Sequence, residues 1–290
     1  MKKRYFFPLF CLVFLVSSST LAIASPLRYF GQPSGSQVSA TPYGDNKAAG
    51  HYIQSGDAKI YYETYGAGDP LFIFHGGGVG SPYELGQIID KLGDKYTVVV
   101  ISSRGHGHSE IGHGPISLRQ KAEDMLAVMR KITSKPAPVL GFSDGAYTAY
   151  ELAASHPEAV EKLAAIGAGT LKPGFFPSSM PLADLKKVDP TYVAQMRSLM
   201  PEPERLQEFL KDDMAFWNKT EIGKDLLAQI KCPVLLVGGD RDSHAPPATV
   251  IEAGKMLGNS RICIVPNAGH AAFLDNFPVT WTAINQFFTK

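Results

Sequence analysis

Residues 139–146 read V-L-G-F-S-D-G-A, and this stretch decides how the rest of the chain is interpreted. An apolar run leads into residues 141–145 and a helix-forming run follows, so the pattern G-x-S-x-G stands between a predicted strand and a predicted helix. Glycines beside the serine allow a turn too tight for side chains, and they tolerate a strained backbone. Such a turn leaves the Ser143 hydroxyl exposed at a helix N-terminus. Because a five-residue pattern also arises by chance, its meaning depends on the residues elsewhere.

The sequence on both sides of this turn alternates between short apolar runs and stretches of helical periodicity. A hairpin of two antiparallel strands is predicted within residues 51–65. Buried strands are predicted at 71–74, 97–101, 163–166, 233–237 and 261–265, and helices at 82–92, 118–133, 247–257 and 279–288. This alternation predicts an α/β fold with a mostly parallel central sheet and helices on both faces.

Four segments are expected along the chain. Residues 1–24 have the features of a signal peptide: basic residues at 2–4, an apolar core from 6 to 16, and the cleavage pattern A-x-A at 22–24. A retained membrane anchor is the alternative, although the apolar core is short for a spanning helix. Residues 25–50 are expected to be a poorly ordered leader. Residues 51–290 form the main domain, with a helical cap inserted at about 170–229, where the alternation stops and helices are expected at 189–199 and 202–217.

The composition indicates an ordinary globular chain with a formal net charge of +1. No strong basic bias points to a nucleic-acid partner, and no metal, nucleotide or other cofactor is implied. Cys11 would leave with the signal peptide. Cys232 and Cys263 could form a disulfide in an oxidising compartment, but each lies at or in a predicted buried strand, which favours two free thiols.

Polar residues follow four of the predicted strands, where functional groups of open α/β sheets gather. His75 and three glycines follow the strand at 71–74, Ser143 follows the next, an Asp-Arg-Asp run occupies 240–242, and His270 follows the strand at 261–265. A serine, an acid and a histidine therefore occur in the chain order that accompanies a nucleophile elbow.

With these motifs in place, the chain resembles the α/β-hydrolase family from about residue 51 to the C-terminus. The resemblance rests on H-G-G-G at 75–78, R-G-H-G-H-S at 104–109, G-F-S-D-G at 141–145, G-D-R-D at 239–242 and N-A-G-H at 267–270. One departure is Ser102, because the family often has Asp two residues before the arginine of the second motif. That loop mainly braces the site, so the departure does not argue against activity.

The resemblance implies a catalytic triad. Ser143 would be the nucleophile, His270 its general base, and Asp242 the acid that orients the imidazole. Asp240 is the alternative acid. The backbone N–H groups of Asp144 and Gly77, with Gly78 as the alternative to Gly77, would form the oxyanion hole. His75 is expected to support that loop, and His106, His108 and His113 to be solvated or turn residues.

A serine nucleophile favours hydrolysis of a small-molecule ester through an acyl-enzyme, with amide or thioester as less favoured substrates. Phe142, Phe176 and Trp217 are expected to contact substrate, although most cap aromatics would simply pack the cap. The side chain of Asp144 either receives a substrate cation or only favours the helix N-terminus. The expectation is an exported, periplasmic or extracellular serine esterase without a stable membrane anchor. The alternatives are an aminopeptidase of the proline-iminopeptidase type, or aminoacyl-ester hydrolase, and a non-catalytic ligand-binding protein of the same fold.

Overall fold

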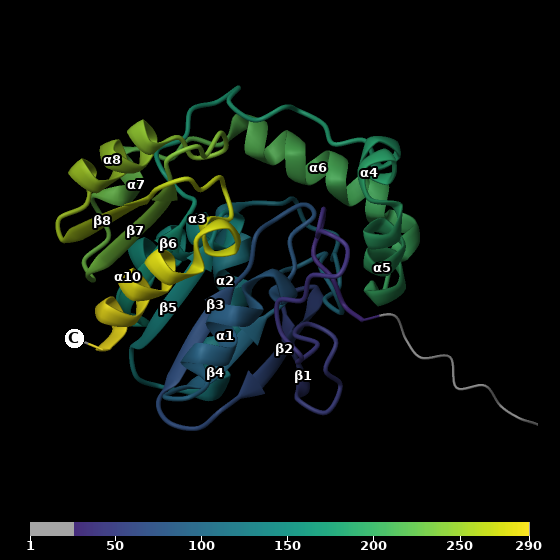
Figure 1. Ribbon diagram of the computed structural model, residues 1–290, viewed down its shortest axis with the longest axis horizontal. Coiled ribbons are helices and arrows are strands. Elements are labelled where there is room, and N and C mark those ends of the chain that lie inside the picture. Colours follow the sequence, from purple (N-terminus) through teal and green to yellow (C-terminus); the bar gives the residue numbers. More distant parts are fainter. Residues whose placement is uncertain (1–25, 290) are drawn as a thin grey trace, which may run out of the picture.

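The computed structural model describes residues 26–289, and its centre is an eight-stranded sheet (Figure 1). The strand order is β1-β2-β4-β3-β5-β6-β7-β8. The strands are β1 (Gly50–Ser55), β2 (Ala58–Tyr65), β3 (Pro70–Phe74), β4 (Thr97–Ile101), β5 (Ala137–Phe142), β6 (Val160–Ile166), β7 (Val234–Gly239) and β8 (Ser260–Val265). Only the β1–β2 and β2–β4 pairs are antiparallel. The predicted fold class and the predicted hairpin are confirmed.

Helices cover both faces of this sheet (Figure 1). They are η1 (Pro82–Leu85), α1 (Gly86–Leu92), α2 (Leu118–Ile132), α3 (Asp144–Ser155), α4 (Leu182–Val188), α5 (Pro190–Leu199), η2 (Pro203–Arg205), α6 (Leu206–Lys219), α7 (Lys224–Leu227), α8 (Pro247–Met256), α9 (Ala272–Asp275) and α10 (Phe277–Thr289). The apolar run of β3 explains why both faces are covered. Phe72 and Phe74 pack in one core cluster with α2, α3 and α8, whereas Leu71 and Ile73 pack in a second with α1 and α10. Neither face of this strand can be left in water.

Among the helices and strands, the structure differs from the sequence-based expectations mainly in short elements. α4, α7 and α9 were not predicted, and β6 begins three residues before the predicted strand at 163–166. The helix predicted at 202–217 is instead a 3₁₀ turn, η2, followed by α6. A helix of four to seven residues contains too few turns for a periodic apolar pattern, so tertiary packing decides these elements.

The cap leaves and rejoins the sheet domain at one point. Leu171 and Ile222 form an isolated antiparallel bridge with hydrogen bonds of 3.0 and 2.9 Å. Between them α4, α5 and α6 pack around a small core of their own, which includes Leu206 and Leu210. Figure 1 shows α6 and α4 above the sheet, with α5 to the right of it. The cap therefore covers the sheet edge at which the candidate site residues lie.

The leader segment is the main structural difference from expectation. Its described part, residues 26–49, packs against the domain rather than lying apart from it. The Tyr43 hydroxyl donates to Asp90 at 2.6 Å, and the Glu63 carboxylate accepts the N–H groups of Gly44 and Asn46, each at 2.7 Å. Because these contacts join residues distant in sequence, the Ser- and Gly-rich composition of the segment does not reveal them and suggests disorder instead.

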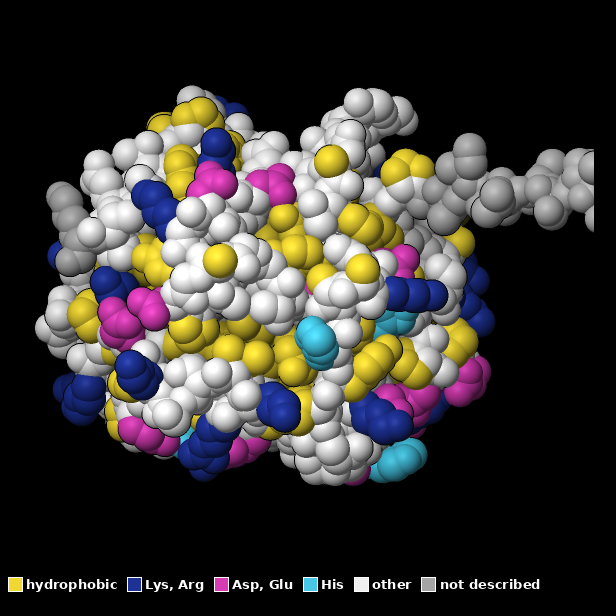
Figure 2. Space-filling model, turned by 90° about the horizontal axis from the view of Figure 1, so that it is seen from below, with side chains coloured by type: hydrophobic (Ala, Val, Ile, Leu, Met, Phe, Trp, Pro, Cys, Tyr) yellow, Lys and Arg dark blue, Asp and Glu magenta, His cyan; other side chains and the backbone are white. Residues whose placement is uncertain are grey.

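Residues 1–25, which contain the predicted signal peptide and Cys11, lie outside the described residues. Among residues 26–289, no helix is long and apolar enough to cross a membrane. Cys232 and Cys263 are free thiols, as favoured from the sequence. Figure 2 shows that basic and acidic side chains are interspersed on the face drawn there.

Candidate active site

The chain turns sharply at Ser143, between β5 and α3. Ser143 itself has the strained backbone, with φ 53° and ψ −118°, a conformation that costs a non-glycine residue free energy. A Cβ at Gly141 would come within 2.5 Å of the Gly145 carbonyl oxygen, and one at Gly145 would overlap the Phe74 carbonyl. The two glycines are therefore needed for close approach of the backbone, while the strain expected near them falls on the serine.

Ser143 lies in a hydrogen-bonded relay with a histidine and an acid from two other strand ends. The Ser143 hydroxyl is 2.8 Å from His270 Nε2, and His270 Nδ1 is 2.9 Å from Asp242 Oδ2. Because a carboxylate only accepts, Nδ1 carries the proton and Nε2 is free to accept the serine proton. This is the geometry that nucleophilic catalysis by serine requires.

Asp242, not Asp240, is the acid of this relay. Its side chain is buried, and Oδ1 accepts the backbone N–H groups of His244 (2.7 Å) and Ala245 (2.9 Å). Burial acts to raise the pKa of Asp242, but these bonds and the bond from His270 outweigh it and lower the pKa. Asp240 instead braces the following loop by accepting the N–H of Ala268 at 3.0 Å. The structure therefore brings Asp242, and not Asp240, to His270.

The glycine loop after β3 lies directly beside the turn that holds Ser143. The N–H of Gly145 donates to the His75 carbonyl at 3.1 Å, and a Cβ at Gly77 would lie 2.8 Å from the Cβ of Asp144. Only glycine fits such an approach. This places Gly77 next to Asp144, as the oxyanion-hole expectation requires, and Gly78 faces Met180 of the cap.

His75 supports that loop, as expected. Nδ1 donates to the Gly76 carbonyl at 2.6 Å and Nε2 accepts the Ser103 N–H at 3.0 Å, so both ring nitrogens are occupied. Burial lowers the pKa of His75 to about 3, so the ring is neutral. His106 lies in a turn, which is one of the two expectations for it, but it is not solvated, because it is buried against His75 and Phe209 of the cap.

Glu84 is a buried acid beside the glycine loop that was not singled out from the sequence. Its Oε1 accepts the N–H groups of Gly76 (3.2 Å) and Ser81 (3.4 Å). Burial raises the pKa of Glu84 to about 8, so the carboxyl is largely neutral at pH 7. The sequence offers one signal for a buried acid here: Glu84 follows Tyr83 in the short apolar helical turn after the glycine loop.

The carboxylate of Asp144 has partners within the protein. It pairs with Lys121 of α2, and Oδ2 accepts the indole N–H of Trp217 at 3.0 Å. Lys121 also pairs with Asp213 of α6 at 2.9 Å. A substrate cation was one expectation for Asp144, but Lys121 already occupies this carboxylate, and the two residues are buried together. Lys121 shares a helix face with Leu118 and Met125, and a lysine on an apolar face is the signal that could have revealed it.

A cavity of about 530 Å³ opens above Ser143 and His270. Of the expected substrate contacts, Phe142, Phe176 and Trp217 all line it. Phe209 and Tyr192 are instead buried, as expected for most cap aromatics, whereas Phe175 is exposed. The other lining residues are Tyr29, Phe30, Gly76, Gly77, Gly78, Val79, Gly80, Glu84, Asp144, Tyr147, Pro177, Met180, Leu185, Asp213, Met214, His244, Ala271 and Leu274. The walls are mainly apolar, which suits an uncharged organic group.

His244 lies beside the relay and lines this cavity. The centroid of its ring is 4.7 Å from that of His270 and 6.2 Å from that of Phe176. Asp242, His244 and His270 offer ligand atoms within 4.8 Å of one another. Because Asp242 and His270 already bond each other in the relay, a metal ion would have to break that bond to bind there.

Comparison with known proteins agrees with this geometry. A family model described as the alpha/beta hydrolase fold matches residues 69–201. Serine hydrolase BPHL of Homo sapiens is 26% identical over 242 residues, which cover 76% of this chain and 80% of that protein. A pimeloyl-[acyl-carrier protein] methyl ester esterase of Aeromonas hydrophila is 25% identical over 245 residues, which cover 75% and 94%.

The fold is also found among solved structures. The enol-lactonase from Burkholderia xenovorans LB400 superposes with a TM-score of 0.68 at 19% identity, over 83% of this chain and 100% of that one. A likeness at this identity supports the fold, while the sequence relatives and the family model support the family. The chain therefore belongs to the α/β-hydrolase family of hydrolytic enzymes.

Proposed function

We propose that this hydrolase is an exported serine esterase that acts on uncharged small-molecule carboxylic esters through an acyl-enzyme intermediate. The observation that carries the proposal is the relay from Ser143 through His270 to Asp242 at the floor of a mainly apolar cavity. The export half of the proposal rests on residues 1–24 of the sequence.

In the proposed reaction, Ser143 Oγ attacks the ester carbonyl carbon while His270 Nε2 takes the hydroxyl proton. The backbone N–H groups of Gly77 and Asp144 would stabilise the oxyanion, a contribution worth about 10²–10³ in turnover per donor in other hydrolases. His270 then protonates the departing alcohol, and water releases the acid by the reverse sequence of proton transfers. Asp242 keeps the imidazole in the tautomer that this cycle needs.

The occupied carboxylate of Asp144 bears on the aminopeptidase alternative. A free substrate amine would have to compete with Lys121, which already bonds both Asp144 and Asp213. The proposal therefore ranks neutral esters above aminoacyl amides. The non-catalytic alternative is disfavoured because it leaves the aligned relay without a role.

The test combines labelling and turnover on the purified protein. A fluorophosphonate probe is expected to label Ser143, and Ser143→Ala is expected to abolish labelling and to lower ester turnover by about 10⁴-fold or more. Ser243→Ala, an exposed serine one residue past Asp242, is the matched control. A panel of aryl esters and aminoacyl arylamides decides the substrate class, and faster hydrolysis of the amides would overturn the ester assignment.

A further inference from the structure

The leader segment reaches the candidate active site. Tyr29 and Phe30 line the same cavity as Ser143 and His270, although more than one hundred residues separate them from either. Phe30 packs edge-on against Tyr192 of α5, with centroids 5.8 Å apart, and it joins the apolar core of the cap. The cavity wall is therefore built from three parts of the chain: the sheet domain, the cap and the leader.

This segment is held in place by a set of specific bonds to α5. The amide side chain of Gln195 bonds both backbone groups of Arg28: Oε1 accepts its N–H at 3.1 Å and Nε2 donates to its carbonyl at 2.9 Å. The Asp189 carboxylate accepts the N–H of Gly31 at 2.9 Å and pairs with the Arg28 guanidinium at 3.0 Å. A two-point backbone clamp with an ion pair fixes both position and direction.

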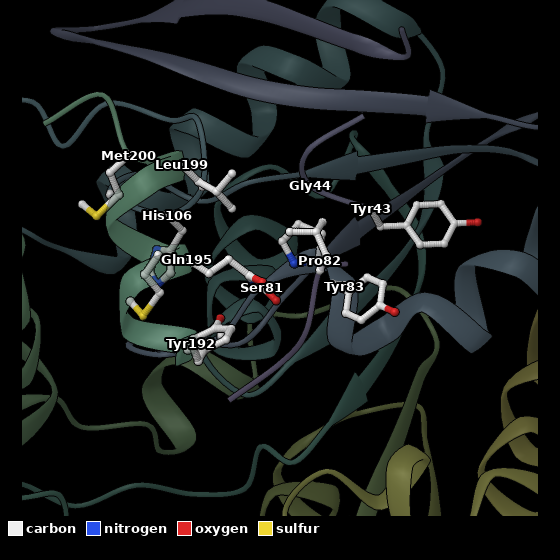
Figure 3. A pocket seen from close by; sticks show the side chains of 15 residues that line it. Tyr43, Gly44, Ser81, Pro82, Tyr83, His106, Tyr192, Gln195, Leu199 and Met200 are labelled. Atoms are coloured by element: carbon white, nitrogen blue, oxygen red, sulfur yellow. The ribbon is translucent and has the colours of Figure 1, made fainter. Parts of the chain in front are cut away.

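The bonds within the segment turn its aromatic side chains toward the cavity. Gln32 closes a short loop, because its Oε1 accepts the Tyr29 N–H at 3.0 Å and its carbonyl accepts from the Arg28 guanidinium at 2.9 Å. Gln195 of the clamp also lines a separate small cavity of about 30 Å³, together with Tyr192 and Leu199 of α5 and with Tyr43 and Ser81 (Figure 3). The start of the described chain lies beside α5 in Figure 1.

We infer that residues 28–31 are a specificity-determining wall of the active site, in which Phe30 contacts the apolar part of the substrate and the Arg28–Gln195 clamp holds Phe30 in position. The inference rests on the proposed serine-hydrolase function of the same cavity. It assigns the leader a role in choosing an apolar group of medium or long chain length over a short one. The clamp begins only three residues after Ser25, so cleavage after Ala24 would leave it intact.

The experiment compares two alkyl fluorophosphonates, one with an ethyl and one with a decyl chain, as labels of Ser143 in the full chain. In Phe30→Ala, the second-order labelling rate of the decyl probe is expected to fall by about tenfold, the loss typical of one buried aromatic contact. The rate of the ethyl probe stays within twofold of the wild-type rate. Phe30→Leu restores most of the decyl rate because it keeps an apolar wall.

Two further variants separate the wall from general effects. Gln195→Ala removes the clamp without touching the cavity that holds Ser143, and it is expected to lower the decyl rate in the same direction by a smaller factor. Tyr52→Ala, an exposed aromatic on β1, is the matched control and should leave both rates unchanged. Thermal unfolding of each variant shows whether the cap is still folded.

The possible results test the proposed function and the specificity wall separately. If neither probe labels the wild-type protein, the proposed serine-hydrolase function fails and this inference fails with it. If both probes label it but the decyl-to-ethyl ratio of folded Phe30→Ala equals or exceeds the wild-type ratio, the proposed function stands and the specificity wall is overturned.

Discussion

Lys121 Nζ lies 2.9 Å from Asp213 Oδ1, and this ion pair joins α2 of the sheet domain to α6 of the cap. The same ammonium group pairs with Asp144, the residue after the candidate nucleophile. Burial acts to lower the pKa of Lys121, but the charges of the two carboxylates outweigh it and raise the pKa. One cation thus connects the cap, the turn at Ser143 and the helix beneath it.

Lys121→Met is expected to destabilise the protein by about 3–5 kcal/mol, because it leaves two buried carboxylates without their cation. Urea unfolding measures the change. Lys131→Met, at the exposed end of the same helix, is the control and should cost much less. In the triple variant Lys121→Met, Asp144→Asn, Asp213→Asn much of the loss should be recovered; a triple variant as unstable as Lys121→Met would show that charge burial is not the cause.

Asp242→Asn is expected to lower kcat by about 10⁴-fold, because an amide no longer holds His270 in the productive tautomer. Asp240→Asn keeps an acceptor for the Ala268 N–H and should retain most of the wild-type activity. Steady-state turnover of an aryl ester compares the two variants. Equal losses of kcat in the two variants would contradict the assignment of Asp242 as the acid that orients His270.

Glu84 should make stability fall as pH rises. Its pKa is about 8 in the folded protein and 4.5 is its ordinary value, so between these pH values the unfolded chain has released a proton that the folded chain retains. Rising pH therefore favours unfolding across this window, by an amount on the order of a few kcal/mol, and the effect levels off above pH 8.

Glu84→Gln removes this titration while keeping an oxygen that accepts from Gly76 and Ser81. The free energy of unfolding of the variant should exceed that of the wild type increasingly from pH 5 to pH 8, as measured by denaturant unfolding at each pH. Glu204→Gln, on the exposed part of the cap, should follow the wild-type curve. If the free energy of unfolding depends on pH in the same way in wild type and Glu84→Gln, then Glu84 does not retain a proton in the folded protein.

Export is testable on the full-length chain in a bacterial host. The mature protein is expected in the periplasm or medium, and mass spectrometry should give a chain that begins at Ser25. Replacing Ala22 and Ala24 by leucine should leave the uncleaved precursor, because signal cleavage needs small residues there. An intact wild-type chain in the cytoplasm would rule out the export proposal.

Local patterns in the sequence were sufficient for the sheet and for the candidate relay. Strands buried on both faces are continuous apolar runs, and a tight turn that brings backbones together needs glycine, so both can be recognised from neighbouring residues. Ser143, Asp242 and His270 can then be picked out as candidates because each of them follows a predicted strand. These features depend on short stretches of chain, each with its own signal.

Only the tertiary structure decided the partners of Asp144 and the position of the leader. Lys121, Asp213 and Trp217 come from helices far apart in sequence, and the charge of Asp144 can be assigned a partner only once α2 and α6 are packed together. Phe30 likewise reaches the cavity through the bonds of Arg28 to Gln195 and Asp189. Burial and long-range pairing are properties of the packed chain as a whole, because a side chain meets these partners only after its backbone has been placed.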